Sequence, residues 1–144
     1  MSSAIKARGT KIKIGDGGTP ETFTTIAEVT DISGPTDDTE EIDVTNHDSP
    51  AGTKEVIMGD RDLGTLTFSG NFIPTNATHD WLTGMVAVHK AGTKHNFQLV
   101  YPDVGNTTRA FQAYIKTLTV KAASKAVLSF DGTLRITGDD TWTA

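Results

Sequence analysis

The sequence predicts a mainly β protein, an antiparallel β-sandwich or barrel with one flanking α-helix. Apolar and polar residues alternate with a period of two in most segments, and turn-forming residues separate these segments. A single stretch has helical spacing, and strand-like segments lie on both sides of it. With 144 residues and no Cys, the chain fits one domain, 1–144, which can bury about two thirds of its unfolded surface without disulfides.

The first half of the chain predicts three strands. Ile12 and Ile14 alternate with lysines, and the Gly-rich residues 15–20 supply a turn. A second strand is expected over about 22–29 and a third over about 39–45, with a turn between them.

The central and later segments predict three longer strands. Residues 62–73 and 94–101 each place apolar side chains on one face. Residues 109–120 begin in the same way, but the parity of the apolar positions changes near Lys116 and Thr117. We expect a β-bulge there, because one extra residue restores a single buried face.

The last strand contains a competing turn signal. Asp131-Gly132 is a strong hairpin dipeptide, but a turn there would place Leu128 opposite Arg135. A single strand over 126–136 instead puts five apolar residues on one face: Ala126, Leu128, Phe130, Leu134 and Ile136. We therefore expect one continuous strand.

One helix is expected, from about Thr78 to Lys90. Trp81, Met85 and Val88, with Leu82 and Val86 beside them, form an apolar stripe at helical spacing, and Gly92 fits the C-terminal stop. This stripe is expected to cover an open end or face of the sheet structure.

The charge is distributed unevenly. The formal net charge is −5, and residues 14–53 hold ten acidic residues and no Lys or Arg. Such a field repels phosphate, so this half of the chain is a poor surface for gripping nucleic acid. A solvated acidic face that maintains solubility is the alternative interpretation.

The sequence assigns no catalytic, cofactor-binding or metal-binding residue. The four His residues lack the spacing of metal ligands, and no nucleophile elbow or phosphate-binding loop is present. An enzyme is therefore the least favoured class. No secretory signal opens the chain and no run reaches the length of a membrane span, so a soluble intracellular product is expected.

The order of several motifs resembles the major tail tube proteins of long-tailed, lambda-like bacteriophages. The residues that carry the resemblance are "GTKIKI" near the N-terminus, "FTTIAEVTDISGP" (23–35), "EEIDVTNHDSPAGTKEVIMGDRDLGTLTFSGNF" (40–72) and "VLSFDGTLRITG" (127–138). The resemblance covers nearly the whole chain. Tail tube proteins of this kind are similar in fold to the secreted ring-forming tube proteins of type VI secretion systems.

The resemblance implies a structural virion protein. Such proteins assemble as hexameric rings that stack into the tail tube, and the viral genome passes through the lumen without specific binding. The implied partners are further copies of the chain, a tape-measure protein, a tail-tip initiator and a tail terminator. The implied location is the virion tail, with the host cytoplasm before assembly.

Under this interpretation, residues 46–62 form an extended assembly loop. Val56, Ile57 and Met58 are expected to contact the adjacent ring or subunit, because a stacking surface is apolar before assembly and buried after it. Lys54, Glu55 and Arg61 are expected to make contacts beside them. The alternative is an ordinary strand that packs on the core of its own subunit.

The N-terminus and the acidic tract complete the expected site. Residues 1–8 are expected to be a flexible arm whose Lys6 and Arg8 meet the acidic face of a neighbour, or alternatively a solvated basic start. The candidate lumen-lining acids are Glu28, Asp31, Glu41 and Asp43.

Two other functions remain open at this point. A β-sandwich binding module of a tail tip or cell surface should present clustered exposed aromatic residues, whereas Trp81 and Trp142 lie far apart in the sequence. A bacterial secretion-tube subunit would share the fold and would also form rings.

Overall fold

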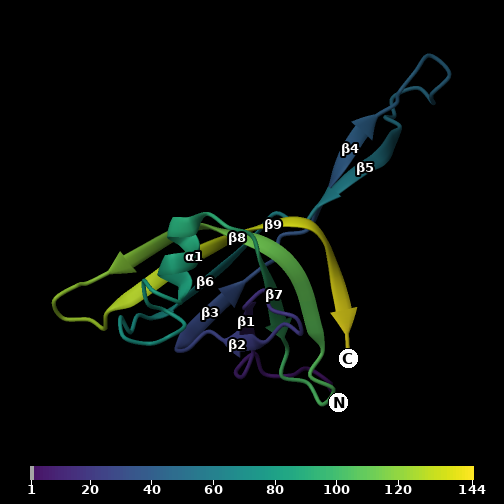
Figure 1. Ribbon diagram of the computed structural model, residues 1–144. Coiled ribbons are helices and arrows are strands. Elements are labelled where there is room, and N and C mark those ends of the chain that lie inside the picture. The colour runs from purple at the N-terminus through teal and green to yellow at the C-terminus, as the bar shows by residue number, and fades with distance from the viewer. Residues whose placement is uncertain (1) are drawn as a thin grey trace.

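The fold consists of a curved antiparallel sheet, a small separate hairpin and one helix. The computed structural model describes residues 2–144 (Figure 1). The large sheet has seven strands in the order β2-β1-β7-β8-β9-β6-β3, and β4 and β5 form a two-stranded sheet of their own. The elements are β1 (Lys11–Gly15), β2 (Phe23–Thr25), β3 (Val29–Ser33), β4 (Asp38–Asp43), β5 (Val56–Asp62), β6 (Thr65–Asn71), α1 (Met85–Ala91), β7 (His95–Val100), β8 (Thr108–Lys121) and β9 (Ser129–Thr143).

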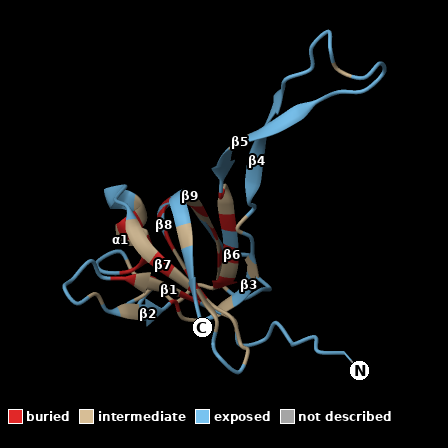
Figure 2. Ribbon diagram, turned by 90° about the vertical axis from the view of Figure 1, so that its right-hand side faces the viewer, coloured by how far each residue is buried: buried red, intermediate tan, exposed pale blue. Residues whose placement is uncertain are grey.

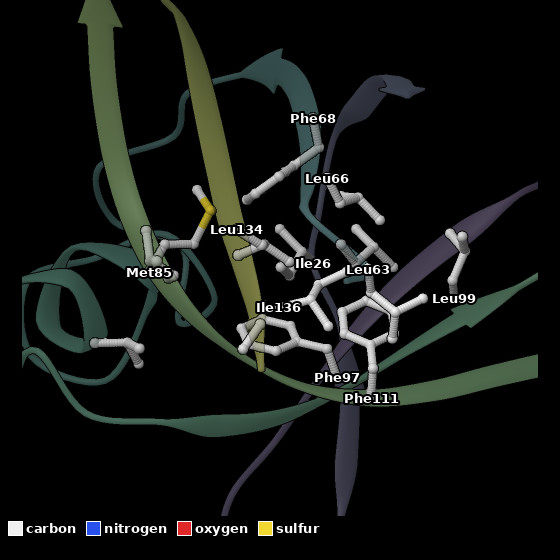
Figure 3. Packing of buried hydrophobic residues seen from close by; sticks show 14 of the residues in the cluster. Ile26, Leu63, Leu66, Phe68, Met85, Phe97, Leu99, Phe111, Leu134 and Ile136 are labelled. Atoms are coloured by element: carbon white, nitrogen blue, oxygen red, sulfur yellow. The ribbon is translucent and has the colours of Figure 1, made fainter. Parts of the chain in front are cut away.

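The hydrophobic core lies inside the curve of the large sheet. One cluster joins Ile12 of β1 and Phe97 of β7 with Leu66 and Phe68 of β6, although these strands lie toward opposite ends of the sheet order. Figure 3 shows Leu66 and Phe68 on one side of this cluster and Phe97 and Phe111 on another, with Leu134 and Ile136 of β9 between them. The sheet bends so that strands near its two ends contribute to one core. The predicted mainly β, antiparallel fold with one flanking helix is confirmed.

Strands β8 and β9, with 14 and 15 residues, are the longest strands of the sheet and lie next to each other near its centre. Their pairing shifts register between Ile115 and Thr117, which is where the change of apolar parity predicted a bulge. Ile115 is buried on one side of the shift and Leu118 is half-buried on the other. The bulge therefore keeps apolar side chains on the inner face along β8.

Strand β9 runs through Asp131-Gly132 without turning, so the prediction of a single strand is confirmed. Phe130, Leu134 and Ile136 are buried on its inner face. A Cβ atom at Gly132 would lie 2.8 Å from the Phe68 ring, so the glycine leaves room for the ring to lie against the strand. Packing across the sheet overrides the local turn preference of this dipeptide.

The expected strand over 22–29 is wrong in its extent, because the chain breaks at Ala27 and Glu28 into β2 and β3. Ile26 is buried at the corner, and Glu28 has a φ of 61°. The backbone N–H of Ala27 donates to the Thr78 hydroxyl at 3.1 Å. The corner moves the chain from pairing with β1 to pairing with β6.

The helix is shorter than predicted and begins at Met85 instead of Thr78. The Asp80 carboxylate accepts hydrogen bonds from the backbone N–H groups of Thr83 and Gly84, each at 2.8 Å, and this closes a separate turn before the helix. Met85 and Val88 are buried as expected and α1 packs on β8. Trp81 and Leu82 are 67% and 65% exposed, so the prediction that they belong to the buried stripe is wrong.

A hairpin projects away from the sheet (Figures 1 and 2). We call residues 38–62 the arm. It consists of β4, a tip over 44–55, and β5. The arm contains the strand expected near 39–45 and the loop expected over 46–62, and the strand expected from Asp62 begins as β6 at Thr65. Within residues 2–144, no helix is long and apolar enough to cross a membrane.

Candidate assembly surface

The arm has apolar side chains that its own chain does not cover. Val56, Ile57 and Met58 are 40%, 54% and 61% exposed. Figure 2 shows the arm almost entirely in the colour of exposed residues, in contrast to the sheet. These three residues therefore do not belong to the core of their own subunit, which was the alternative interpretation of this segment.

Both faces of the arm carry exposed apolar residues. Ile42 pairs with Ile57 in the β4–β5 register, so the two side chains share one face. Glu41 pairs with Met58 and Asp43 with Val56, so acidic and apolar side chains mix on the other face. Ile42 and Val44 are each 38% exposed. Their alternation with acidic residues correctly indicates a strand but does not indicate what lies against it.

The tip of the arm is closed by short-range hydrogen bonds. The backbone N–H of Glu55 donates to the Thr45 hydroxyl at 2.9 Å, and the N–H of Val44 donates to the Glu55 carbonyl at 2.9 Å. Lys54 and Glu55 are exposed beside Val56. The tip therefore presents a charged border next to the apolar triplet.

The arm meets the sheet through arginine–aspartate pairs. Arg61 was expected to contact another subunit, but in this structure its Nε lies 2.9 Å from both carboxylate oxygens of Asp37 and its Nη1 lies 2.7 Å from Asp139. Arg135 of β9 binds both carboxylate oxygens of Asp62, at 2.8 and 2.9 Å. The guanidinium group of Arg61 therefore forms its ion pairs with aspartates of its own chain.

These pairs shift the titration of the aspartates. The hydrogen bonds from Arg61 lower the pKa of Asp37, and those from Arg135 lower the pKa of Asp62. Burial works against ionisation of Asp140, but the hydrogen bond and charge of Arg109 outweigh it, and its pKa is also lowered. All three carboxylates are therefore charged near neutral pH.

The N-terminal residues border a groove of about 640 Å³ next to β3. Ile5, Lys6 and Arg8 of the N-terminal segment line it together with Val29 and Ile32 of β3. Lys6 and Arg8 are exposed, and residues 2–8 form no helix or strand. Met1, the first residue of the N-terminal segment 1–8 that was expected to be flexible, lies outside the described residues.

The four candidate lumen acids do not come together. Glu28 lies in the turn before β3 and Asp31 lies on β3, whereas Glu41 and Asp43 lie on β4 in the arm. All four are exposed. The acidic tract of the sequence is therefore divided between the sheet and the arm.

The outer surface of β3, β6, β9 and β8 is rich in hydroxyl groups, a feature that sequence reasoning described only as a wet strand face. The register places Asp31, Ser69, Asp131 and Thr119 in one cross-strand row, and Ser33, Thr67, Thr133 and Thr117 in the next. We call these eight residues the hydroxyl face. The period-two alternation of Thr and Ser along β6 is the signal from which it could have been found.

Histidine and carboxylate side chains are not arranged for metal chemistry in the described residues 2–144, where no group of three such residues could hold an ion. His79 is fully buried, with Nδ1 accepting from the Ile73 N–H at 3.0 Å and Nε2 lying 2.6 Å from the Ala27 carbonyl. Both ring nitrogens are thus used in holding the backbone together.

Solved structures of tail tubes share this fold. The tail of an empty gene transfer agent particle, with C6 symmetry, has 22% identity and a TM-score of 0.80, covering 98% of this chain and 100% of that chain. The tube complex of an extracellular contractile injection system, PVC, has 14% identity and a TM-score of 0.70, covering 100% and 94%. The SPP1 tail tube has 12% identity and a TM-score of 0.71, covering 96% and 78%.

A search of curated proteins gave no match. The sequence model of the lambda phage tail tube protein family, TTP, matches residues 9–143, which is nearly the whole chain. The resemblance expected from the motifs is confirmed, and it agrees with the fold and with the uncovered arm. The chain belongs to the lambda phage tail tube protein family and is a structural protein of a phage-type tail.

Proposed function

We propose that this chain assembles into stacked hexameric rings and that the arm makes the contact with the adjacent ring or subunit. The observation that carries the proposal is the exposure of Val56, Ile57 and Met58 on a hairpin that has no core of its own. An isolated two-stranded hairpin is marginally stable in water, so a protein that projects one gains by covering it. A second copy of the chain is the cover that repeated assembly supplies.

Head-to-tail contacts between identical chains propagate, because each copy presents both halves of the interface. Burying three large apolar side chains contributes on the order of 1.5 to 3 kcal/mol each, before the cost of association is subtracted. The neighbouring Lys54 and Glu55 add charged contacts that favour one register over others. The C6 symmetry of the similar gene transfer agent tail supports a ring of six.

The hydroxyl face is our candidate for the lumen wall. Its serines and threonines are uncharged and Asp31 adds negative charge, while Asp131 is paired with Lys121, so the face offers DNA little to hold it. Glu28 lies at the start of β3 beside this face and is included in the proposal. Glu41 and Asp43 lie on the arm, and their place on the lumen depends on how the arm packs on the next copy.

The remaining contacts follow from the same assembly. Lys6 and Arg8 border the groove next to β3, and we propose that they meet acidic side chains of a neighbouring copy. A tape-measure protein inside the lumen, an initiator at the tip and a terminator at the other end are the proposed partners. The role is structural and not enzymatic, and the protein is proposed to stay in the host cytoplasm until assembly starts.

Negative-stain electron microscopy of the purified protein across concentration, together with light scattering, tests the assembly. We expect rings or hollow tubes from the unmodified chain. Replacing Val56, Ile57 and Met58 with Ser should leave a folded protein that forms no tubes. A control variant that replaces the exposed Val104 and Val127 with Ser removes apolar surface outside the arm and should still assemble.

Two results would contradict the proposal. Tubes formed normally by the triple Ser variant would remove the arm from the assembly contact. A persistent monomer of the unmodified chain, at high concentration and in the presence of preformed tail tips, would instead favour a binding module.

A further inference from the structure

The arm is joined to the sheet by two bidentate arginine–aspartate pairs, one on each connection. Asp37 precedes β4, and the Nε and Nη2 atoms of Arg61 lie 2.9 and 2.6 Å from its Oδ2. Asp62 ends β5, and Arg135 holds both of its carboxylate oxygens. A planar guanidinium bound in this way fixes direction as well as distance.

Both pairs lead to the same strand of the sheet. Arg135 is part of β9, and Arg61 also reaches Asp139 at 2.7 Å and Asp140 at 3.4 Å near the end of that strand. The Asp140 side chain is only 3% exposed, and Arg109 of β8 binds it at 2.5 Å. We call the seven-stranded sheet with α1 the body. Arg61 therefore links the arm to a buried carboxylate of the body that is itself paired with Arg109.

The backbone at the same place is closely packed. Leu63, directly after the arm, is buried in the core. Gly64 has a φ of 65°, and a Cβ atom there would lie 2.6 Å from the Thr36 carbonyl oxygen. The Thr36 N–H donates to the Thr65 carbonyl at 3.2 Å, so the incoming and outgoing chains are bonded to each other below the arm.

We propose that Arg61 and Arg135 are positioning residues that hold the arm in one direction in the free subunit, so that the next copy meets a prealigned contact. This inference rests on the proposed role of the arm in assembly. The pairs are partly exposed and contribute little to global stability. Their value lies in geometry, because a preset arm loses less conformational freedom when it binds.

The direction of the arm can be measured directly, because the chain has no Cys and two can be introduced without background. Spin labels at Ala51→Cys in the tip and Ala123→Cys in the body report the distance between arm and sheet by pulsed electron resonance. We expect a narrow distance distribution in the monomer. In Arg61→Gln/Arg135→Gln the distribution should become broad, while the melting temperature stays within about 4 °C of the unmodified value.

Assembly supplies the second readout. If only about a tenth of the variant molecules hold the arm in the competent direction, the concentration needed for tube formation rises about tenfold. Lys121→Gln is a control for the loss of a surface ion pair outside the arm, because it removes one charge and the pair with Asp131. In the Arg61→Gln background, the charge swap Asp62→Arg/Arg135→Asp retains a pair between the same two positions and should give a narrower distribution than Arg61→Gln/Arg135→Gln.

The outcomes separate this inference from the assembly proposal. An unchanged distance distribution in the double variant would show that the arginines do not hold the arm. A broad distribution with an unchanged concentration for tube formation would show that prealignment is not used. The triple Ser variant at 56–58 addresses the assembly contact itself, whatever the direction of the arm, so failure of one proposal is not mistaken for failure of the other.

Discussion

The body and the arm are both antiparallel β-structure, yet they differ in what covers their side chains. Phe68, Phe97 and Phe130 in the body are at most 2% exposed, whereas Ile57 and Met58 in the arm are more than half exposed. The backbone pairing is antiparallel in both regions, although the β4–β5 register of the arm shifts between Thr39 and Glu41. A two-stranded antiparallel hairpin can therefore form in this chain without a core of its own. The position of such a hairpin then depends on its attachment to the body or on contact with a partner.

The largest expected effect is a loss of stability from the core of the body. Phe68 contacts Phe130 with ring centroids 5.7 Å apart and lies against Gly132. Phe68→Ala should lower the free energy of unfolding by about 3 to 5 kcal/mol, because it leaves a cavity between strands. Ile57→Ala in the arm should change it by less than about 0.5 kcal/mol. Urea unfolding followed by far-UV circular dichroism measures both; similar losses in the two variants would remove the distinction between body and arm.

A smaller loss is expected from a polar group within the core. His79→Phe keeps a ring against Phe72 and Phe130 but removes the hydrogen-bond partners of the Ile73 N–H and the Ala27 carbonyl. Two buried backbone groups without partners should cost about 2 to 4 kcal/mol of unfolding free energy.

The position of the lost hydrogen bonds gives a check on this explanation. Amide hydrogen exchange at Ile73 should become faster in the His79→Phe variant than exchange in the β8–β9 ladder. Equal changes throughout the sheet would mean that the ring packing, and not the hydrogen bonding, determines the cost.

The body could be predicted well from the sequence because its alternation reports burial. The bulge near Lys116 and the single strand through Gly132 both follow from keeping apolar residues on one face. The break at Ala27 and the late start of α1 did not follow, because they depend on hydrogen bonds to Thr78 and Asp80. Those bonds join segments that are distant in sequence or that compete with helix formation, and a periodic pattern does not report either case.

The assembly surface could be predicted only in part. An apolar triplet in a loop-like stretch correctly indicated an uncovered segment at 56–58. The pattern could not assign the three aspartate partners of Arg61, because Asp37, Asp139 and Asp140 lie 24, 78 and 79 residues away in the sequence. The hydroxyl face depends on the register of four strands, and its two cross-strand rows can be identified only when those strands are aligned.

The arm itself should contribute little to the stability of the monomer. Replacing Val56, Ile57 and Met58 with Ser should change the free energy of unfolding of the body by less than about 1 kcal/mol, because these side chains are already exposed to water. The same urea measurement tests this. A loss of several kcal/mol would mean that the arm packs on its own chain in solution and that its exposure is not the reason for assembly.

The smallest effect on stability, and the sharpest test of the connection between the two regions, is expected from acid. Because the pKa values of Asp37 and Asp62 are lowered, their attraction to Arg61 and Arg135 is complete above the ordinary value of 3.8 and is lost as the pH falls through their lower values in the folded protein. The distance distribution between the labelled tip and body should therefore stay narrow from pH 7 to about 5 and broaden below pH 3.8.

Other groups protonate in the same range, so the comparison with a variant decides the cause. Asp140 and Asp43 also have lowered pKa values, and Asp43 lies in the arm, where it accepts hydrogen bonds from Thr45. In Arg61→Gln/Arg135→Gln the distribution should already be broad at pH 7 and should change little on acidification. If acid broadens the variant as much as the unmodified chain, then the acid effect arises in the tip or at Asp140. If only the unmodified chain responds, the two arginine–aspartate pairs are what couple a region with a core to a region without one.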